Sequence, residues 1–391
     1  MTNAQLGTLG SANLPMKTNF QNHRGLDAIT GKGNFDIAEW MVHHLIDLLR
    51  SRTATLALLM KHSVARKILS HHWQLRTPLA RPRVFLFDAK HHFDVSVDAV
   101  LLVLEFSGQT SALSCPVSTL DRPEVNLTKI ALIDDCLVAD SDAYDELRHL
   151  KQSVPPPALR WRSGTKHDCT QVMEFSRCGQ TLSNGLGERV EIEPDYLYPL
   201  LKGSAVAGGG QSDSRYMLVT QKTPGDDTSV LRANAPATWD YLLGHARLLD
   251  ARGSSIYKKR PRFSVFGIGP YTFTPWKIAI CALYKKLAFQ LVGPRDGRPV
   301  VFDDTVYYLS FDQEITARFV TELLNSSAAT SFLSAFIFWD NKRPITVEIL
   351  NRLSLTALAS HLGRNEDLAL LHSCKSASTD HLPGPLFGAA V

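Results

Sequence analysis

The sequence lacks the patterns that mark membrane proteins, secreted proteins and several large enzyme classes. No apolar run approaches the ~20 residues of a membrane-spanning helix, and no basic region followed by an apolar run stands at the N-terminus. We therefore predict neither a membrane partner nor a secretory signal. The GxSxG, HExxH, P-loop and protein-kinase motifs are absent as well, so the sequence carries none of those catalytic signatures.

Cysteine is sparse, and its spacing indicates neither disulfides nor a metal site. The six cysteines contain no CxxC pair, and although His167 and Cys169 stand two residues apart, they have no second ligand pair at zinc-finger spacing. Several histidines are adjacent in the sequence, but neighbours on a helix point in different directions, so we predict no metal. Free thiols in a reducing compartment are the simplest interpretation, and we expect a cytoplasmic protein.

The composition is that of an ordinary globular protein. Hydrophobic residues make up 44% and charged residues 20% of the 391 residues, a length that allows two or more domains with separate cores. The net charge is +4 and the isoelectric point is near 8.7. This charge permits an acidic partner such as nucleic acid and does not require one.

The N-terminal third predicts part of an α/β domain. Apolar residues recur at helical spacing over about 36–50, and residues 62–73 also read as a helix. The run "TATLALLM" (53–60) has the length and composition of a buried parallel strand. Residues 83–88 and 95–106 predict two more strands with a short connection. We interpret this order as the closing half of a doubly wound α/β domain with a hairpin at one edge, because no strand–turn–helix unit precedes residue 35.

A second domain is expected after a stiff connector. "KIALIDDCLVAD" (129–140) predicts a strand pair with a turn at Asp134–Asp135, and "SVPPPALRW" (153–161) reads as a polyproline-like linker. Beyond it, strands are expected at 215–221, 262–269 and 305–311, with helices at 237–252 and 314–326. The last residues, rich in Ser, Pro, Gly and Ala, predict a poorly ordered tail.

The sharpest local signal is the basic string "SSIYKKRPRF" (254–263). Lys258, Lys259, Arg260 and Arg262 lie between two aromatic residues, Tyr257 and Phe263. Basic side chains neutralise phosphates and aromatic rings stack on bases, so a nucleic-acid surface is one interpretation and a solvated charged face is the other. The string "RWRSGTKHDC" (160–169), with Arg162 and Lys166, leaves the same two interpretations open.

A glycine-containing string and a single phenylalanine are two further candidates for a functional role. "FGIGPYTFTPWK" contains Gly267 and Gly269 but lacks the third glycine and the strand–loop–helix context of a nucleotide loop, so a backbone turn is the better interpretation. Phe93 precedes an expected buried strand and reads as a core or edge aromatic unless a further argument gives it a role.

Several long strings resemble one family. "TNAQLGTLGSANLPMKTNF" and "GLDAITGKGNFDIAEWM" resemble the segment after the catalytic NPPW/NPPY motif of adenine-specific, S-adenosylmethionine-dependent DNA methyltransferases of restriction-modification systems. "FDAKHHFDVSVDAVLL" resembles a later strand pair of their catalytic domain. "RWRSGTKHDC", "NGLGERVEIEPDYLYPLLK", "SSIYKKRPRFSVFGIGPYTFTPWKIAI", "VVFDDTVYYL" and "FIFWDNKRPIT" resemble their target-recognition domain. The resemblance covers about residues 1–358.

The resemblance implies a fold and a division of labour. It implies the C-terminal part of a Rossmann-like methyltransferase domain in residues 1–115, a connecting segment in 116–157, a DNA target-recognition domain in 158–360 and a tail in 361–391. It also implies S-adenosylmethionine as cofactor and double-stranded DNA as partner. An aromatic residue at the position of Phe93 packs on the flipped adenine in this family, and Phe87 is a weaker candidate. Phosphate contacts are expected from the basic positions, namely Arg162, Lys166, Lys222, Lys258, Lys259, Arg260 and Arg262.

The sequence departs from the family at its most important motif. The Asn-Pro-Pro-aromatic motif, whose amide and carbonyl oxygens accept hydrogen bonds from the target amino group, does not occur in the 391 residues, and Met1 stands where the residue after it would stand. We therefore expect a partial methyltransferase that is inactive alone. A separate chain supplying the catalytic half, a non-enzymatic DNA-binding specificity module and an inert gene remnant remain as alternatives.

Overall fold

The computed structural model describes residues 37–108, 113–209, 214–258, 260–372 and 374. These residues form two units. The first comprises the described chain up to Arg148 together with Ser334–Lys342, and the second comprises His149–Leu333 and the described chain from Arg343 onward. The opening loop, most of the string that follows it and Lys259 lie outside the described residues. Within the described part, no helix is long and apolar enough to cross a membrane.

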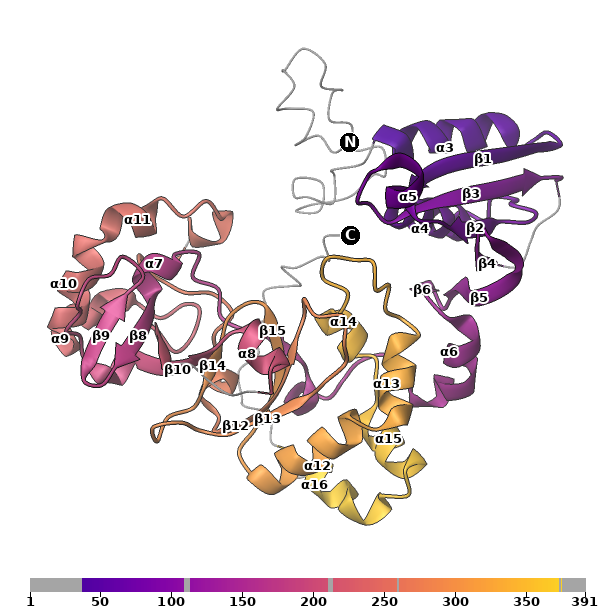
Figure 1. The fold of residues 1–391 in the computed structure, drawn as a ribbon. Helices are drawn as coiled ribbons and strands as arrows, with labels where there is room; N and C mark the ends of the chain where they lie inside the picture. The colour runs from indigo at the N-terminus through magenta and orange to yellow at the C-terminus, as the bar shows by residue number, and fades with distance from the viewer. Residues whose placement is uncertain (1–36, 109–112, 210–213, 259, 373, 375–391) are drawn as a thin grey trace. The chain divides into compact units, whose positions relative to one another are not determined.

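The first unit is built on a six-stranded mixed sheet with the strand order β1-β3-β2-β4-β5-β6. Its elements are α3 (Ile37–Leu49), β1 (Ala54–Lys61), α4 (His62–Gln74), β2 (Arg83–Leu86), α5 (Ala89–Phe93), β3 (Ala99–Phe106), β4 (Ser114–Thr119), β5 (Arg122–Ile133), β6 (Cys136–Val138) and α6 (Ser141–Leu147) (Figure 1). The helices expected at 36–50 and 62–73 are confirmed. So is the turn at Asp134–Asp135, where both residues adopt positive φ.

The core of the first unit lies between the sheet and the two long helices. Val42 and Ile46 of α3 join Ile68, Leu69 and Trp73 of α4 in one buried cluster with the inward side chains of the sheet. The apolar positions recur at helical spacing on both helices, which is why the sequence pattern located them correctly.

The prediction of a buried parallel strand at 53–60 is right about the strand and wrong about its burial and its pairing direction. β1 is a strand, but it pairs antiparallel with β3 along its whole length and stands at the end of the sheet among the described residues. Its side chains alternate between half-buried and exposed over most of the strand, and Leu59 is 56% exposed. Among the described strand pairs of this sheet only β2 and β4 run parallel. The α/β class holds in this broader sense of a mixed sheet with helices.

The connection between the next two strands is longer than expected. β2 and β3 pair antiparallel, as a hairpin requires, but β3 begins at Ala99 and not at residue 95. The short helix α5 fills the connection, because the Asp88 carboxylate caps it by accepting hydrogen bonds from the backbone N–H groups of Lys90 (2.9 Å) and His91 (3.1 Å). Phe93 therefore ends a helix and does not start a strand.

The second unit contains two further sheets and several short helices. Its strands are β7 (Arg162–Ser163), β8 (Glu174–Cys178), β9 (Thr181–Asn184), β10 (Leu197–Leu201), β11 (Arg215–Leu218), β12 (Trp276–Cys281), β13 (Gln290–Val292), β14 (Val301–Phe302) and β15 (Val306–Phe311). One sheet has the order β14-β10-β11-β8-β9 and the other β13-β12-β15-β7.

The helices of the second unit follow the strands closely. The α-helices are α7 (Thr170–Met173), α8 (Gly203–Ala207), α9 (Leu231–Asn234), α10 (Pro236–Gly244), α11 (Ala246–Asp250), α12 (Glu314–Leu324), α13 (Ser327–Ser334), α14 (Val347–Leu350), α15 (Leu355–His361) and α16 (Leu368–His372). The 3₁₀ turns that matter below are η5 (Pro194–Tyr196), η7 (Ser255–Tyr257) and η8 (Pro270–Phe273).

Three expectations for this unit need correction. Residues 262–269 form no strand, because Phe263 and Gly267 adopt positive φ and only Phe266 makes a bridge, to Lys166. The helix expected at 237–252 is divided at His245 into α10 and α11. Helical structure also continues to residue 372, with Leu371 buried, inside the segment that was expected to be a poorly ordered tail.

Candidate nucleic-acid interface

The segment 160–169 passes through the centre of the second unit. The backbone N–H of Gly164 donates to the carbonyl of Val306 (2.9 Å), and that of Thr165 donates to Phe302 (2.7 Å). A Cβ atom on Gly164 would lie 2.0 Å from the carbonyl oxygen of Asp303. Only glycine fits there, so the glycine of "RSGTK" is explained by the close approach of two backbone segments.

We predict that Gly164→Ala destabilises the protein by about 1–3 kcal/mol, because the added methyl group must displace backbone and not a flexible side chain. The measurement is the urea denaturation midpoint of the full chain. Gly244→Ala is the matched control, since a Cβ atom there meets nothing within 4 Å. Equal midpoints for the two variants would contradict the tight approach.

The strings "RWRSGTKHDC" and "FGIGPYTFTPWK" contact each other at Lys166 and Phe266. The backbone of Lys166 and that of Phe266 exchange two hydrogen bonds of 2.8 Å. Gly267, with φ of 72°, faces the carbonyl oxygen of Gly164, which a Cβ atom would approach to 2.7 Å. The interpretation of "FGIG" as a backbone turn is therefore confirmed, and the turn fastens the 262–269 segment to the "SGTK" segment.

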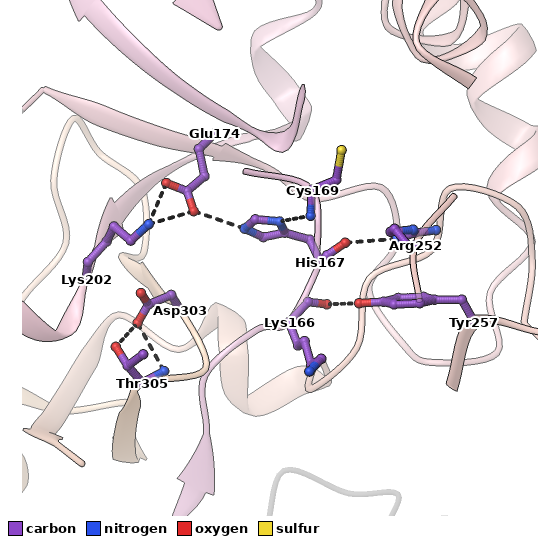
Figure 2. Close-up of polar contacts among 9 residues, drawn as sticks. All are labelled: Lys166, His167, Cys169, Glu174, Lys202, Arg252, Tyr257, Asp303 and Thr305. Carbon is purple, nitrogen blue, oxygen red and sulfur yellow. Dashed lines mark hydrogen bonds and ion pairs between the residues drawn. The ribbon is translucent and has the colours of Figure 1, made fainter. Parts of the chain in front are cut away.

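A buried polar cluster follows directly after Lys166 (Figure 2). His167 Nε2 lies 3.2 Å from Glu174 Oε1, and Lys202 Nζ donates to both carboxylate oxygens of Glu174 at 2.9 Å. The Cys169 backbone N–H donates to His167 Nδ1 (3.1 Å), so that nitrogen accepts and Nε2 carries the proton given to Glu174. The closest charge pair of the cluster is Lys202 with Glu174.

The electrostatics of the cluster favour an ionised Glu174. Burial alone would raise its pKa, but the hydrogen bonds from His167 and Lys202 outweigh burial and hold the pKa below the ordinary value. Asp303 lies close to this pair, and burial raises its pKa although the Thr305 hydroxyl donates to it at 2.5 Å. The cluster binds β8, β10 and the β14–β15 turn together around the "KHDC" segment.

A second set of contacts ties the basic string to the same segment. The Tyr257 hydroxyl donates to the carbonyl of Lys166 (3.2 Å), and Arg252 Nη1 donates to the carbonyl of His167 (3.2 Å) (Figure 2). Arg252 Nη1 also donates to the carbonyl of Ser264 (2.7 Å). The Arg252 guanidinium also lies 3.8 Å from the centroid of the Tyr257 ring. Tyr257 and Arg252 therefore hold η7 and the start of "KKRPRF" against the residues around Lys166.

The loop after β11 joins this assembly from another side. Arg260 Nη1 donates to the carbonyl of Pro224 (3.2 Å), and the Thr220 hydroxyl donates to the carbonyl of Phe263 (3.0 Å). The Asp226 carboxylate accepts from the backbone N–H groups of Lys222 (3.0 Å) and Thr223 (2.8 Å) and so shapes the loop that carries Lys222. Three basic segments that are distant in the sequence thus adjoin one another, and we call this surface, made of Lys166, Lys222, Lys258 and Arg260, the basic surface.

The predicted DNA-binding residues differ in how exposed their charges are. Lys222 and Lys258 are exposed, and Arg260 is half-buried. Lys166 Nζ lies 3.3 Å from an Asp168 carboxylate oxygen. The Arg262 guanidinium is paired with the Asp250 carboxylate at 2.6 Å, and this pairing reduces the attraction of Arg262 for phosphate. Arg162 stands on β7 with its guanidinium 4.8 Å from the centroid of the Tyr271 ring.

Phe93 of the first unit lies on the surface. Its side chain is 56% exposed, so of the two interpretations, a core or an edge aromatic, the core aromatic is wrong. It contacts Phe87 with a ring-centroid distance of 6.0 Å in an edge-to-face arrangement. The two aromatic candidates from the sequence therefore lie together at the end of β2 and in α5, where an apolar ring surface faces outward.

Sequence reasoning missed the cluster of His167, Glu174, Lys202 and Asp303. The sequence marks "KHDC" as the end of a basic string and as a His–Cys pair without a second ligand pair, and nothing in it links Glu174 to Lys202 across 28 positions. Among the described residues, no group of three His, Cys, Asp or Glu side chains could hold a metal ion. The cluster is a buried polar network that shapes the interface.

Comparison with known proteins places this geometry in context. No family model matches the chain. The chain is 47% identical over 361 residues to the type II methyltransferase M.NspV of Nostoc sp. (strain ATCC 29411 / PCC 7524), covering 92% of this chain and 74% of the relative. It is also similar to a structure of the Type IIL restriction-modification enzyme MmeI in complex with DNA, with 12% identity and a TM-score of 0.45. That similarity covers 91% of this chain and spans 53% of the other.

Proposed function

Since the chain belongs to the type II methyltransferases, the DNA methyltransferases of restriction-modification systems, we propose that its second unit holds double-stranded DNA for methylation of a target adenine at N6. The observation that carries this proposal is that three basic segments adjoin one another: the basic string contacts the segment of Lys166, and the loop that carries Lys222 contacts the basic string. Lys222 and Lys258 are exposed there, with Arg260 and Lys166 beside them. Such a surface neutralises phosphates and fixes the register of a duplex without reading its sequence.

Apart from the hydrogen bond from Arg260 to the Pro224 carbonyl, the contacts that hold the interface do not depend on the charges that would meet DNA. Arg252 and Tyr257 fix the basic string by hydrogen bonds to main-chain carbonyls, and Glu174 with Lys202 fixes the strands behind it. The exposed lysines can therefore be replaced without removing the supports of the fold, which makes the proposal testable by substitution.

We propose that Phe93 stacks on the flipped adenine, as the family resemblance implies. Its ring is exposed and backed by Phe87, so it offers a flat apolar surface at little cost in further desolvation. Base-flipping enzymes hold the extruded base between aromatic or apolar side chains, which is the role that an exposed, supported ring can take.

S-adenosylmethionine is the methyl donor that the family implies, but the described residues of the first unit do not fit it. A nucleotide cofactor needs a strand followed by a glycine-rich turn, where backbone can approach the ligand. Gly108 is the one glycine in this part of the chain, and a Cβ atom there would meet nothing within 4 Å. We therefore assign no described residue to the cofactor and derive no step through it.

We further propose that the catalytic residues come from polypeptide outside the described residues, whether in the same protein or in a separate chain. β1 ends the described sheet, and Leu59 on its outer face is exposed together with Met41 and Leu48 of α3. An unpaired strand edge beside exposed apolar side chains is a surface on which another segment can pack.

The test of the DNA-binding proposal is a triple variant of Lys222, Lys258 and Arg260 to Ala in the full chain. Each lost phosphate contact lowers the slope of log K against log salt by about 1, so we expect the slope to fall by about 2–3 and binding to weaken equally for all duplex sequences. Fluorescence anisotropy with labelled duplexes over a salt series measures both quantities.

The matched control replaces Lys129, Arg189 and Arg318 by Ala. These substitutions remove the same three positive charges as the basic-surface variant, but from exposed ion pairs outside the basic surface. If the control lowers the slope as much as the basic-surface variant does, the effect belongs to net charge and the proposed interface is wrong.

A further inference from the structure

A cleft of about 390 Å³ opens in the second unit next to the basic surface. Its walls include three aromatic side chains, Tyr196, Tyr198 and Phe273, and its lining also contains Gln221 and Lys222. Each of the three rings is half-buried and not fully packed. Tyr198 and Phe273 contact each other, with ring centroids 5.3 Å apart and an interplanar angle of 58°.

The cleft is held rigid by hydrogen bonds around it. Arg298 donates to the carbonyls of Asp195 (3.0 Å) and Leu197 (3.2 Å) and to the Asp195 carboxylate (3.2 Å), and its guanidinium lies 5.6 Å from the centroid of the Tyr198 ring. The Gln221 side chain accepts from the backbone N–H of Val265 (3.2 Å). The aromatic walls therefore stand in place before any ligand arrives, which favours binding.

The charge of the cleft favours a ligand with one phosphate and one flat ring. Asp195 pairs with Arg298, and the exposed side chain of Lys222 adds a second positive charge to the lining, which also acts on the nearby Asp226 carboxylate. Aromatic rings stack on nucleobases without regard to sequence, and a pocket of this volume is in the range that holds a small ligand. Lys222 also belongs to the basic surface, so DNA bound there would pass the mouth of the cleft.

We propose that this cleft receives one unpaired base of the bound DNA, with the base against Tyr198 and Phe273 and its phosphate near Lys222. The inference rests on the proposed DNA-binding function and adds a second base-binding site in the second unit, separate from the exposed Phe93 of the first unit. Its consequence is that the chain prefers duplexes in which one base is already out of the stack.

The experiment compares two labelled duplexes of the same sequence, one fully paired and one with a single unpaired adenine, by anisotropy with the full chain. We expect the unpaired adenine to increase affinity about tenfold. Tyr198→Leu and Phe273→Leu keep apolar volume but remove the stacking face, and each should bring the two affinities to within about twofold. Tyr284→Leu is the control, because Tyr284 is an exposed aromatic of the same unit outside the cleft.

The outcomes separate the two proposals. A chain that binds neither duplex refutes the DNA-binding proposal itself, whereas equal binding of both duplexes refutes only the cleft. A preference that survives in Tyr198→Leu and Phe273→Leu would mean that the unpaired adenine acts through duplex flexibility or through stacking on Phe93, and either result overturns the cleft assignment. Binding of the paired duplex at parental affinity shows that each variant is folded.

Discussion

Mixed-sequence duplex DNA incubated with the 391-residue chain and labelled S-adenosylmethionine is expected to remain unlabelled. The reason is chemical. The exocyclic amino group of adenine is a poor nucleophile because its lone pair is delocalised into the ring. In the adenine-specific methyltransferases that this sequence resembles, the Asn-Pro-Pro-aromatic motif supplies an amide oxygen and a carbonyl oxygen that accept hydrogen bonds from that amino group. The 391 residues contain no Asn-Pro-Pro sequence, and their one run of adjacent prolines, Pro155–Pro157, follows Val154.

The expected loss is large. Removing a single hydrogen-bonding group that stabilises a transition state costs on the order of 10²–10³ in rate, and the motif that supplies both acceptors does not occur in the 391 residues. Filter-binding of labelled DNA measures the transfer. M.NspV, the relative at 47% identity, is the positive control, and duplex binding by the same preparation of the chain shows that it is folded. Labelling well above background would refute the proposal that this chain needs catalytic residues from elsewhere.

The sequence predicted local structure best where the apolar pattern was regular. α3, α4 and α12 lie where helical spacing placed them, because each buries one face against a sheet or a neighbouring helix. The same pattern could not give the surroundings of a strand. The apolar run of β1 predicts a buried strand because most of its side chains are apolar, yet alternate side chains of the strand are exposed in the described residues. An apolar composition indicates that a strand can be buried, but it does not determine which of its side chains the fold covers.

The candidate interface shows the same division. The basic strings were visible in the sequence, and the residues named there, Lys222 and Lys258 among them, do lie on adjoining segments. What the sequence did not contain was the means of joining them. Main-chain carbonyls of Lys166 and His167 accept from Tyr257 and Arg252, and a carbonyl has no signature in a sequence. The pairing of Arg262 with Asp250 was equally invisible, and it weakens one of the predicted phosphate contacts.

Acidification is expected to destabilise the first unit between about pH 6.5 and pH 4. His43 of α3 and His72 of α4 face each other with 2.9 Å between His43 Nδ1 and His72 Nε2, and His72 Nδ1 lies 3.0 Å from the Thr77 hydroxyl. One nitrogen of the histidine pair must accept while the other donates, so the contact requires that at least one ring be neutral. Both side chains are buried in the seam between the two helices.

The direction of the pH effect follows from the pKa values. Burial, with repulsion from His71, lowers the pKa of His43 from 6.5 to about 4, and burial with repulsion from His43 lowers the pKa of His72 from 6.5 to about 3. The unfolded chain therefore binds more protons than the folded chain in this interval. The stabilisation is fully present above pH 6.5, declines as the pH falls and is lost by about pH 3–4. Each histidine contributes a slope of up to about 1.4 kcal/mol per pH unit.

Urea denaturation of the full chain from pH 7.5 to pH 4.5 measures this slope. Replacing His72 by Gln removes one titrating group while keeping a side chain that can both donate and accept a hydrogen bond. The slope of the unfolding free energy against pH should therefore fall by up to about 1.4 kcal/mol per pH unit in that variant, which corresponds to one proton. His91→Gln is the matched control, because His91 is an exposed histidine of the same unit. A third histidine, the partly buried His62, whose pKa burial and repulsion from Arg66 lower to about 4, adds to the slope in the parent and in both variants alike. If the slopes of His72→Gln and His91→Gln are the same, proton uptake by the α3–α4 seam does not govern acid unfolding, and the loss of stability must come from groups elsewhere in the chain.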